Sequence, residues 1–146
     1  MSGQKGRLAH CYRCIYTWRV RKQGKPSVCP RCKSKFWGSP KIRPVVLGDG
    51  LGIDEVIGSR RRDLILLASR CGARNVRVFG SVRRREADKQ SDVDLLVAWN
   101  RKASLLDVAR FRIGARKLLH RKVDVVEESR LHWAVRPQVI YEAIAL

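Results

Sequence analysis

The sequence predicts an α+β fold: a small mixed β-sheet with flanking helices, preceded by a compact segment rich in cysteine. Two observations lead to this prediction. Helix and strand signals alternate over residues 53–146, whereas residues 8–44 contain four of the five cysteines and four of the five prolines, with few aliphatic side chains. Residues 45–52 contain three glycines and are interpreted as a linker. The chain is therefore expected to hold two domains, 8–44 and 53–146.

The elements of the second domain follow from the spacing of apolar residues. Residues 53–71 have the periodicity of an amphipathic helix that stops at Gly72. Val76–Phe79 and Val93–Trp99 are predicted strands, and residues 104–119 are a predicted helix. Lys122–Val126 is a third predicted strand, and residues 136–145 a last helix. The order α-β-β-α-β-α suits one modest core.

Two Cys-x-x-Cys pairs in the first domain have the spacing of a tetrahedral metal site. Cys11 and Cys14 are followed by Cys29 and Cys32, and the intervening segment is expected to fold back as a hairpin. A structural Zn²⁺ ion would supply folding free energy that so few apolar residues cannot. Two disulfides, a redox pair and an iron-thiolate centre are the alternatives. His10 is not needed as a ligand, and Cys71 is expected to be a packing residue.

The chain is strongly basic. Thirty-two Lys and Arg residues face thirteen Asp and Glu residues, which gives a net charge of +19, and the excess is densest in the first fifty residues. Such a charge attracts polyanions, of which nucleic acid is the commonest, although a solvated basic surface is the simpler explanation. The apolar runs are too short to cross a bilayer and no signal peptide is recognised, so we expect a soluble, cytoplasmic protein without a membrane partner.

Aromatic residues alternate with these cations in the predicted zinc ribbon. Cations can hold phosphates while exposed aromatic rings stack on unpaired bases, so RNA is the expected partner. The alternatives are that the aromatic rings pack around the two Cys-x-x-Cys turns, or knuckles, or that the ribbon is a protein-binding surface. The candidate nucleic-acid-binding residues are Arg13, Arg19, Arg21, Lys22, Lys33 and Lys35.

Three carboxylates in the second domain point to metal chemistry. Asp92 and Asp94 are two residues apart at a predicted strand and should share one face, and Asp124 lies in another predicted strand. Hard oxygen ligands suit Mg²⁺. Gly80 and Ser81 follow a strand and would form a turn that faces a phosphate. Each signal is weak alone, but together they are the parts needed for phosphoryl or nucleotidyl transfer.

In this order and spacing, residues 53–146 resemble the minimal nucleotidyltransferases of the polymerase-beta superfamily. The resemblance rests on Gly80-Ser81, on Asp92-x-Asp94 and on Asp124. It implies that Asp92, Asp94 and Asp124 are catalytic and hold Mg²⁺, and that Gly80, Ser81 and Arg84 bind the triphosphate. It also implies a nucleotidyltransferase that moves a nucleoside monophosphate, expected to be AMP from ATP, to an acceptor.

The acceptor could be a protein or an RNA. Many proteins of this family resemble antitoxins that modify a HEPN-type ribonuclease, which implies a protein acceptor, whereas the zinc ribbon and the charge favour RNA. The run Arg83-Arg84-Arg85 departs from the family pattern, which usually has a small residue and a glycine around the arginine that follows the Gly-Ser turn. A non-catalytic RNA- or ribosome-binding protein that keeps the fold is therefore the alternative, as is an antitoxin that acts by contact alone.

Overall fold

The computed structural model describes residues 6–21 and 23–146 and divides the chain into two compact units, with the boundary between Arg43 and Pro44. The fold is α+β, as expected from the sequence. No helix among the described residues is long and apolar enough to cross a membrane.

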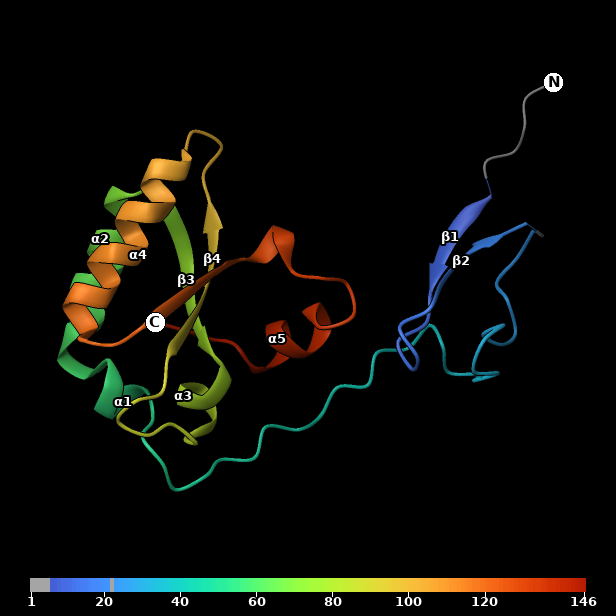
Figure 1. Cartoon of the computed structure of the whole chain (residues 1–146), viewed down its shortest axis with the longest axis horizontal. Coiled ribbons are helices and arrows are strands. Elements are labelled where there is room, and N and C mark those ends of the chain that lie inside the picture. The colour runs from blue at the N-terminus through green and yellow to red at the C-terminus, as the bar shows by residue number, and fades with distance from the viewer. Residues whose placement is uncertain (1–5, 22) are drawn as a thin grey trace. The chain divides into compact units, whose positions relative to one another are not determined.

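The first unit is a two-stranded hairpin joined to a coiled segment (Figure 1). Strands β1 (Arg7–His10) and β2 (Thr17–Val20) pair antiparallel, with Arg7 opposite Val20 and His10 opposite Thr17. The hairpin therefore encloses the first cysteine pair, and does not lie between the two pairs as the spacing suggested. Its small core consists of buried Ala9, Cys11, Cys29 and Trp37.

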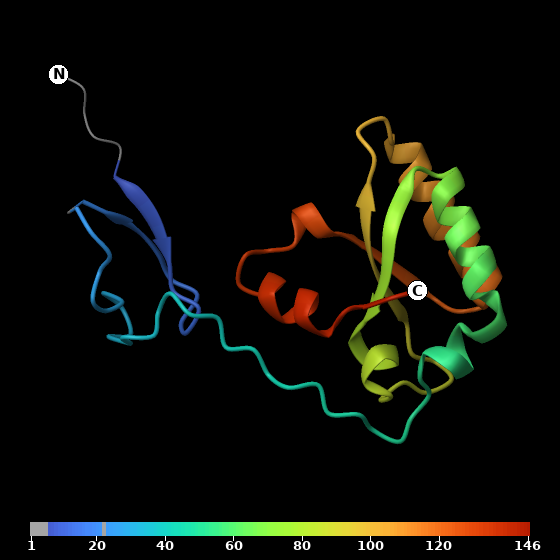
Figure 2. The same cartoon turned by 180° about the vertical axis from the view of Figure 1, so that it is seen from behind.

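The second unit contains a four-stranded mixed sheet in the order β5-β4-β3-β6. Strand β3 (Ala73–Phe79) runs antiparallel to β4 (Val93–Trp99), which runs parallel to β5 (Val123–Glu127). Strand β6 (Ile144–Ala145) pairs antiparallel with the other edge of β3. Helices α2 (Arg61–Arg70) and α4 (Leu105–Leu119) lie side by side over one face, and α5 (Arg136–Glu142) lies on the other side (Figures 1 and 2).

The core forms between the sheet and helices α2 and α4. Phe111, Ala115 and Leu119 recur every four residues along α4, and all three are buried. The two helices approach closely at Gly114, where a Cβ atom would lie 2.7 Å from the Leu67 side chain. Ser104 begins α4 by accepting a hydrogen bond from the Asp107 amide, while the Asp107 carboxylate accepts one from Ser104.

The helix predicted over residues 53–71 is broken into three pieces, and the single-helix prediction was wrong. They are α1 (Ile53–Val56), the 3₁₀ turn η1 (Gly58–Arg60) and α2. Gly58 has a φ of +43°, a left-handed conformation that glycine adopts without strain, and it interrupts the helical hydrogen bonds. Gly72, with a φ of +75°, follows the end of α2 as expected.

The C-terminal helix is also shorter than predicted. It ends at Glu142 because Ala143 is extended, and Ile144–Ala145 then pair with β3 as strand β6. A second 3₁₀ turn, η2 (Glu128–Arg130), follows β5. The other short helix, α3 (Gly80–Arg84), begins directly after β3.

The glycine-rich stretch before α1, which was predicted as a linker, is part of the second unit and packs against the residues that end α3. The amides of Gly48 and Gly50 donate hydrogen bonds of 2.8 and 2.7 Å to the carbonyls of Arg84 and Arg85. A Cβ atom at either glycine would lie 2.7 Å from a backbone oxygen, so only glycine permits this approach. Residues 48–50 thereby hold the C-terminal end of α3 in place.

Candidate active site and metal centres

Gly80 places the start of α3 directly against a carboxylate. Its φ is +73°, and a Cβ atom there would lie 2.1 Å from Oδ2 of Asp94. Glycine is thus required both for the backbone conformation and for the space. Ser81 follows at the same turn, and its carbonyl accepts a hydrogen bond from the Glu86 amide.

The register of the sheet brings the three aspartates to the same edge. Asp94 in β4 is paired with Phe79 of β3 on one side and with Asp124 of β5 on the other. Asp92 directly precedes β4, two residues from Asp94, so the alternation of a strand directs both toward one face. Gly80, Asp92, Asp94 and Asp124 are therefore neighbours.

Asp94 is the most buried of the three aspartates. It is partly buried, whereas Asp92 and Asp124 are exposed. Burial raises the pKa of Asp94, and the negative charges of Asp124 and Asp92 raise it further, while Arg84 opposes the shift. A divalent cation among these oxygens would relieve the repulsion. The donor set fits a hard cation, and the two exposed carboxylates leave room for phosphate oxygens in the coordination sphere.

The loop before Asp92 is held by a network that the sequence analysis did not identify. The Asp88 carboxylate accepts hydrogen bonds from the amides of Gln90 and Ser91 and from the Ser91 hydroxyl, at 2.8–2.9 Å. Arg121 donates to the carbonyls of Asp88 and Ser91. The pattern Asp-x-x-Ser was the available signal, because such side chains commonly close turns on their own backbone.

Glu142 is a second residue that the sequence analysis did not select. It is the only buried charged residue among those the structure describes, with 6% of its surface exposed. One carboxylate oxygen accepts the Gly80 amide at 2.9 Å and the Arg84 guanidinium at 3.2 Å. The sequence offered little to identify it, because Glu142 belongs to no motif. Its one distinction is that it is the only acidic residue after Glu128.

The three consecutive arginines bind groups other than the aspartates. Arg84 contacts Glu142 and also donates to Glu86 at 2.8 Å. Arg83 donates to the Glu142 carbonyl at 3.0 Å, and Arg85 contacts Glu55 at 3.0 Å. Within residues 6–21 and 23–146, no ion pair joins an arginine to Asp92, Asp94 or Asp124, so these charges do not neutralise the carboxylates directly.

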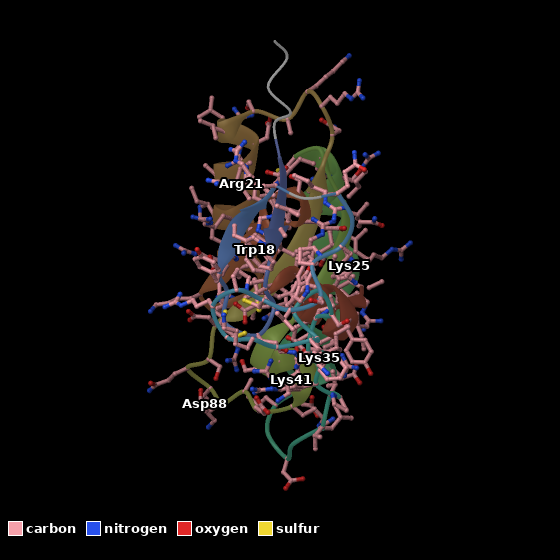
Figure 3. The ribbon with its side chains drawn as sticks, turned by 90° about the vertical axis from the view of Figure 1, so that its right-hand side faces the viewer. Trp18, Arg21, Lys25, Lys35, Lys41 and Asp88 are labelled. Atoms are coloured by element: carbon pink, nitrogen blue, oxygen red, sulfur yellow. The ribbon has the colours of Figure 1, made fainter. Side chains whose placement is uncertain are left out.

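The four cysteines of the first unit converge on one point (Figure 3, sulfur in yellow). Their sulfur atoms all lie within 4.8 Å of one another, and none of the four is in a disulfide. The distances Cys11–Cys32 and Cys14–Cys29 are 3.7 and 3.8 Å between sulfur atoms. A tetrahedral zinc site with Zn–S bonds of about 2.3 Å requires about 3.8 Å between its sulfurs. The cluster therefore fits a structural zinc ion.

The two knuckles have matching backbone turns. The Ile15 amide donates to the Cys11 carbonyl, and the Lys33 amide donates to the Cys29 carbonyl. Ile15 and Lys33 occupy the same place in their knuckles and have φ of 60° and 59°. Burial opposes ionisation of Cys29, but amides of Cys32 and Arg31 donate to its sulfur and lower the pKa of the thiol to about 7. In the other turn, burial raises the pKa of the Cys14 thiol to about 12. The turns alone therefore do not ionise all four sulfurs, and a bound cation would favour their thiolate forms.

The structure separates the predicted nucleic-acid-binding cations by what they contact. Arg13 donates to the Phe36 carbonyl at 3.4 Å, and Lys33 to the Pro30 carbonyl at 2.9 Å. Arg19 and Arg21 instead line a surface cavity of about 440 Å³, together with Lys25. Lys35 is exposed, and Figure 3 labels it with Arg21 and Lys25. Lys22 lies outside the described residues.

The aromatic residues of this unit are only partly available for stacking. Trp37 is buried, and its indole N–H donates to the Pro26 carbonyl at 2.9 Å. Trp18 packs edge-on against Trp37 at 5.0 Å and lies parallel to Tyr16 at 6.1 Å between ring centroids. Packing thus explains Trp37, while Phe36, which is 67% exposed, and Tyr16 are at the surface.

Comparison with known proteins agrees with this fold. The model of the family described as "Nucleotidyltransferase domain" matches residues 67–146. A protein of Methanocaldococcus jannaschii, named provisionally as a protein adenylyltransferase, is 30% identical over 88 residues, which are 60% of this chain and 95% of that protein. The protein adenylyltransferase MntA of Thermococcus cleftensis is 33% identical over 92 residues, 63% of this chain and 90% of that protein.

Two solved structures share the fold. One, described provisionally as a minimal nucleotidyltransferase, has 44% sequence identity and a TM-score of 0.60, and the match covers 68% of this chain and all of that one. The other, described as a toxin-antitoxin with AMP-PNP, has 17% identity and a TM-score of 0.51, and the match covers 58% of this chain and 70% of that one. At this lower identity the likeness concerns the fold alone.

Proposed function

Because this chain belongs to the nucleotidyltransferase domain family and is a nucleotidyltransferase, we propose that it transfers AMP from ATP to a hydroxyl group of a partner protein. The observation that carries the proposal is the pairing of Asp94 with Asp124 beside Gly80, with Asp92 two residues away. Mg²⁺ held by these three carboxylates would neutralise charge that develops on the phosphates.

In the proposed reaction each residue has a distinct task. Ser81 and Arg84, placed by the turn that Gly80 forms, bind and orient the terminal phosphates, which fixes the α-phosphorus for attack. The acceptor oxygen forms a bond to that phosphorus, the bond to the bridging oxygen breaks, and pyrophosphate leaves. Asp124, the exposed carboxylate of β5, lies closest to the incoming acceptor in this scheme and takes its proton.

Labelled ATP tests the proposal. With Mg²⁺ and ATP labelled at the α-phosphate, we expect label on a co-purified acceptor, and none when the label is at the γ-phosphate. Asp92→Asn with Asp94→Asn should abolish labelling. The matched control is Asp54→Asn with Asp63→Asn, which removes two exposed carboxylates outside the site. Transfer that survives the first pair, or label from the γ-phosphate, would refute the assignment.

Two observations support a protein as the acceptor: the names of the relatives and the family resemblance. We infer a protein acceptor because both curated relatives are named as protein adenylyltransferases. The family resemblance alone suggests that this acceptor is a HEPN-type ribonuclease, which the modification would inactivate. Co-expression with the ribonuclease and mass spectrometry should find AMP on a hydroxyl side chain. Inhibition that persists with the Asp92 and Asp94 variants would instead indicate an antitoxin that acts by contact, and label removed by nuclease would indicate an RNA acceptor.

The first unit supports a second role, which is RNA binding. Residues 1–43 contain twelve Lys and Arg residues and no Asp or Glu, so no carboxylate within this segment competes with phosphate. The cavity lined by Arg19, Arg21 and Lys25 concentrates three of these charges. Each phosphate contact on a single strand adds about 0.7 to the slope of log affinity against log salt concentration.

Two matched pairs of substitutions test this role. Arg19→Ala with Arg21→Ala should lower affinity for single-stranded RNA and reduce the salt slope by roughly one to two. Arg13→Ala with Lys33→Ala removes the same charge from side chains that bond backbone carbonyls, and should change the slope less. Equal effects of the two pairs would show that charge alone, without the cavity, attracts RNA. Binding that persists in the aspartate variants would separate this role from catalysis.

A further inference from the structure

A buried carboxylate from the C-terminal helix binds the turn on which the proposed function depends. One oxygen of Glu142 accepts both the Gly80 amide and the Arg84 guanidinium, and its other oxygen lies 3.4 Å from the same nitrogen of Arg84. Sixty-two residues of sequence separate Glu142 from Gly80. The contact therefore exists only because the C-terminal segment returns to the start of α3.

The backbone on both sides of Glu142 is held in place. It is the last residue of α5, and two residues later Ile144 pairs with Val78 in β3. The Glu142 carbonyl also accepts a hydrogen bond from Arg83 at 3.0 Å. The helix, the strand and the hydrogen bond from Arg83 thus restrain the backbone of Glu142. Its carboxylate therefore loses little conformational entropy when it orients its partners.

Burial makes these contacts strong. The side chain of Glu142 is 7% exposed and that of Arg84 is 33% exposed, so their interaction is screened less than the exposed pair that Arg84 makes with Glu86. Without Glu142, Arg84 would keep, among the described residues, only its solvent-exposed ion pair with Glu86, which restrains a side chain weakly. Held by Glu142, its remaining N–H groups have a fixed position close to Gly80.

We propose that Glu142 is a positioning residue, which holds Arg84 and the Gly80 turn in the geometry that binds the terminal phosphates of ATP. The inference rests on the proposed function, since it concerns the same nucleotide site. Glu142 acts through Arg84 and does not contact the substrate, so its effect belongs to nucleotide binding and not to the chemical step.

A double-mutant cycle on the full chain tests this role. Glu142→Gln keeps an oxygen that can accept the Gly80 amide but removes the charge that holds Arg84. We expect a KM for ATP about tenfold higher, with kcat within about threefold, and an equal loss of affinity for a non-hydrolysable ATP analogue in the presence of Mg²⁺. In the Arg84→Ala background the same substitution should change affinity by less than about twofold.

Three further variants complete the experiment. Glu86→Gln removes only the exposed partner of Arg84 and should leave the affinity for the analogue nearly unchanged. Glu142→Asp keeps the charge, and should recover part of the affinity lost in Glu142→Gln. If Glu142→Gln does not fold, as judged by its unfolding transition, the comparison of Glu142→Asp with and without Arg84→Ala replaces it.

The outcomes separate this inference from the proposed function. Additive effects of the Glu142 and Arg84 substitutions, or a lower kcat at unchanged KM, would overturn the positioning role while nucleotide transfer stands. A native chain that binds no ATP analogue in the presence of Mg²⁺ would overturn both. Non-additive loss of affinity with retained kcat supports the assignment.

Discussion

Substitution of Gly80 by alanine imposes two costs, one for the left-handed backbone conformation and one for displacing the Asp94 carboxylate. Comparison with Gly58→Ala separates them. The added Cβ would lie 2.1 Å from Oδ2 and 3.0 Å from Cγ of Asp94, so one of the two residues has to move. Gly58 provides a matched position, because it also has a positive φ but no neighbouring atom within 4 Å of where a Cβ would lie. Both variants are Gly→Ala changes in the second unit.

The expected magnitudes differ. Gly58→Ala should cost about 1–2 kcal/mol of unfolding free energy, which is the ordinary cost of a left-handed conformation for a residue with a Cβ. Gly80→Ala has the same cost, and an Asp94 side chain forced from its rotamer adds roughly 0.5–1.5 kcal/mol. A displacement of about 1 Å in a catalytic group lowers a rate about 100-fold. Gly80→Ala should therefore reduce nucleotidyl transfer by about that factor, while Gly58→Ala leaves it near that of the native chain.

Urea unfolding of the second unit and transfer from α-labelled ATP measure the two effects. The decisive comparison is activity under conditions in which both variants are folded. Gly80→Ala with activity equal to that of Gly58→Ala would show that Asp94 tolerates displacement, and the placement of Asp94 at the centre of the site would then be wrong.

Three other predictions concern the zinc site, one of its two Cys-x-x-Cys turns, and the partly buried Asp94. Cys29→Ser should remove the zinc found by metal analysis and unfold the first unit, while the unfolding transition of residues 44–146 stays unchanged; a shift in that transition would contradict independent units. Ile15→Gly should stabilise the first unit by up to about 1 kcal/mol, because Ile15 is 62% exposed and has a φ of 60°; thermal unfolding of the zinc-bound protein measures it, and a loss of stability would refute the reasoning. Asp94→Asn should raise the unfolding free energy of the second unit at pH 7 without added Mg²⁺. The pKa of Asp94 in the folded chain is raised, by burial first and then by Asp124 and Asp92, so the folded chain loses stability as the pH rises from the ordinary Asp pKa to the raised one. The advantage of Asn should shrink as the pH falls through this window, and a difference independent of pH would exclude this cause.

Sequence alone determined the features that depend on neighbouring residues. The Cys-x-x-Cys spacing predicted a four-sulfur cluster because each pair forms its own turn, and the sulfurs do converge. The strands around Val78 and Leu95 and the helix that contains Phe111 were found because local periodicity reflects burial. Gly80-Ser81 and Asp92-x-Asp94 identified a candidate site for the same reason. Turn geometry places the two residues of the first motif, and strand alternation places the two aspartates of the second on one face.

Only the tertiary structure decided which distant residues meet at that site. The pairing of Asp94 with Asp124 depends on the register of parallel strands, which no local pattern specifies. The contact of Glu142 with Gly80 depends on a C-terminal segment that was predicted as helix and instead ends in strand β6. Such contacts arise when whole elements pack and bury their surfaces together, so the energy that selects them is not present in any short segment of the chain.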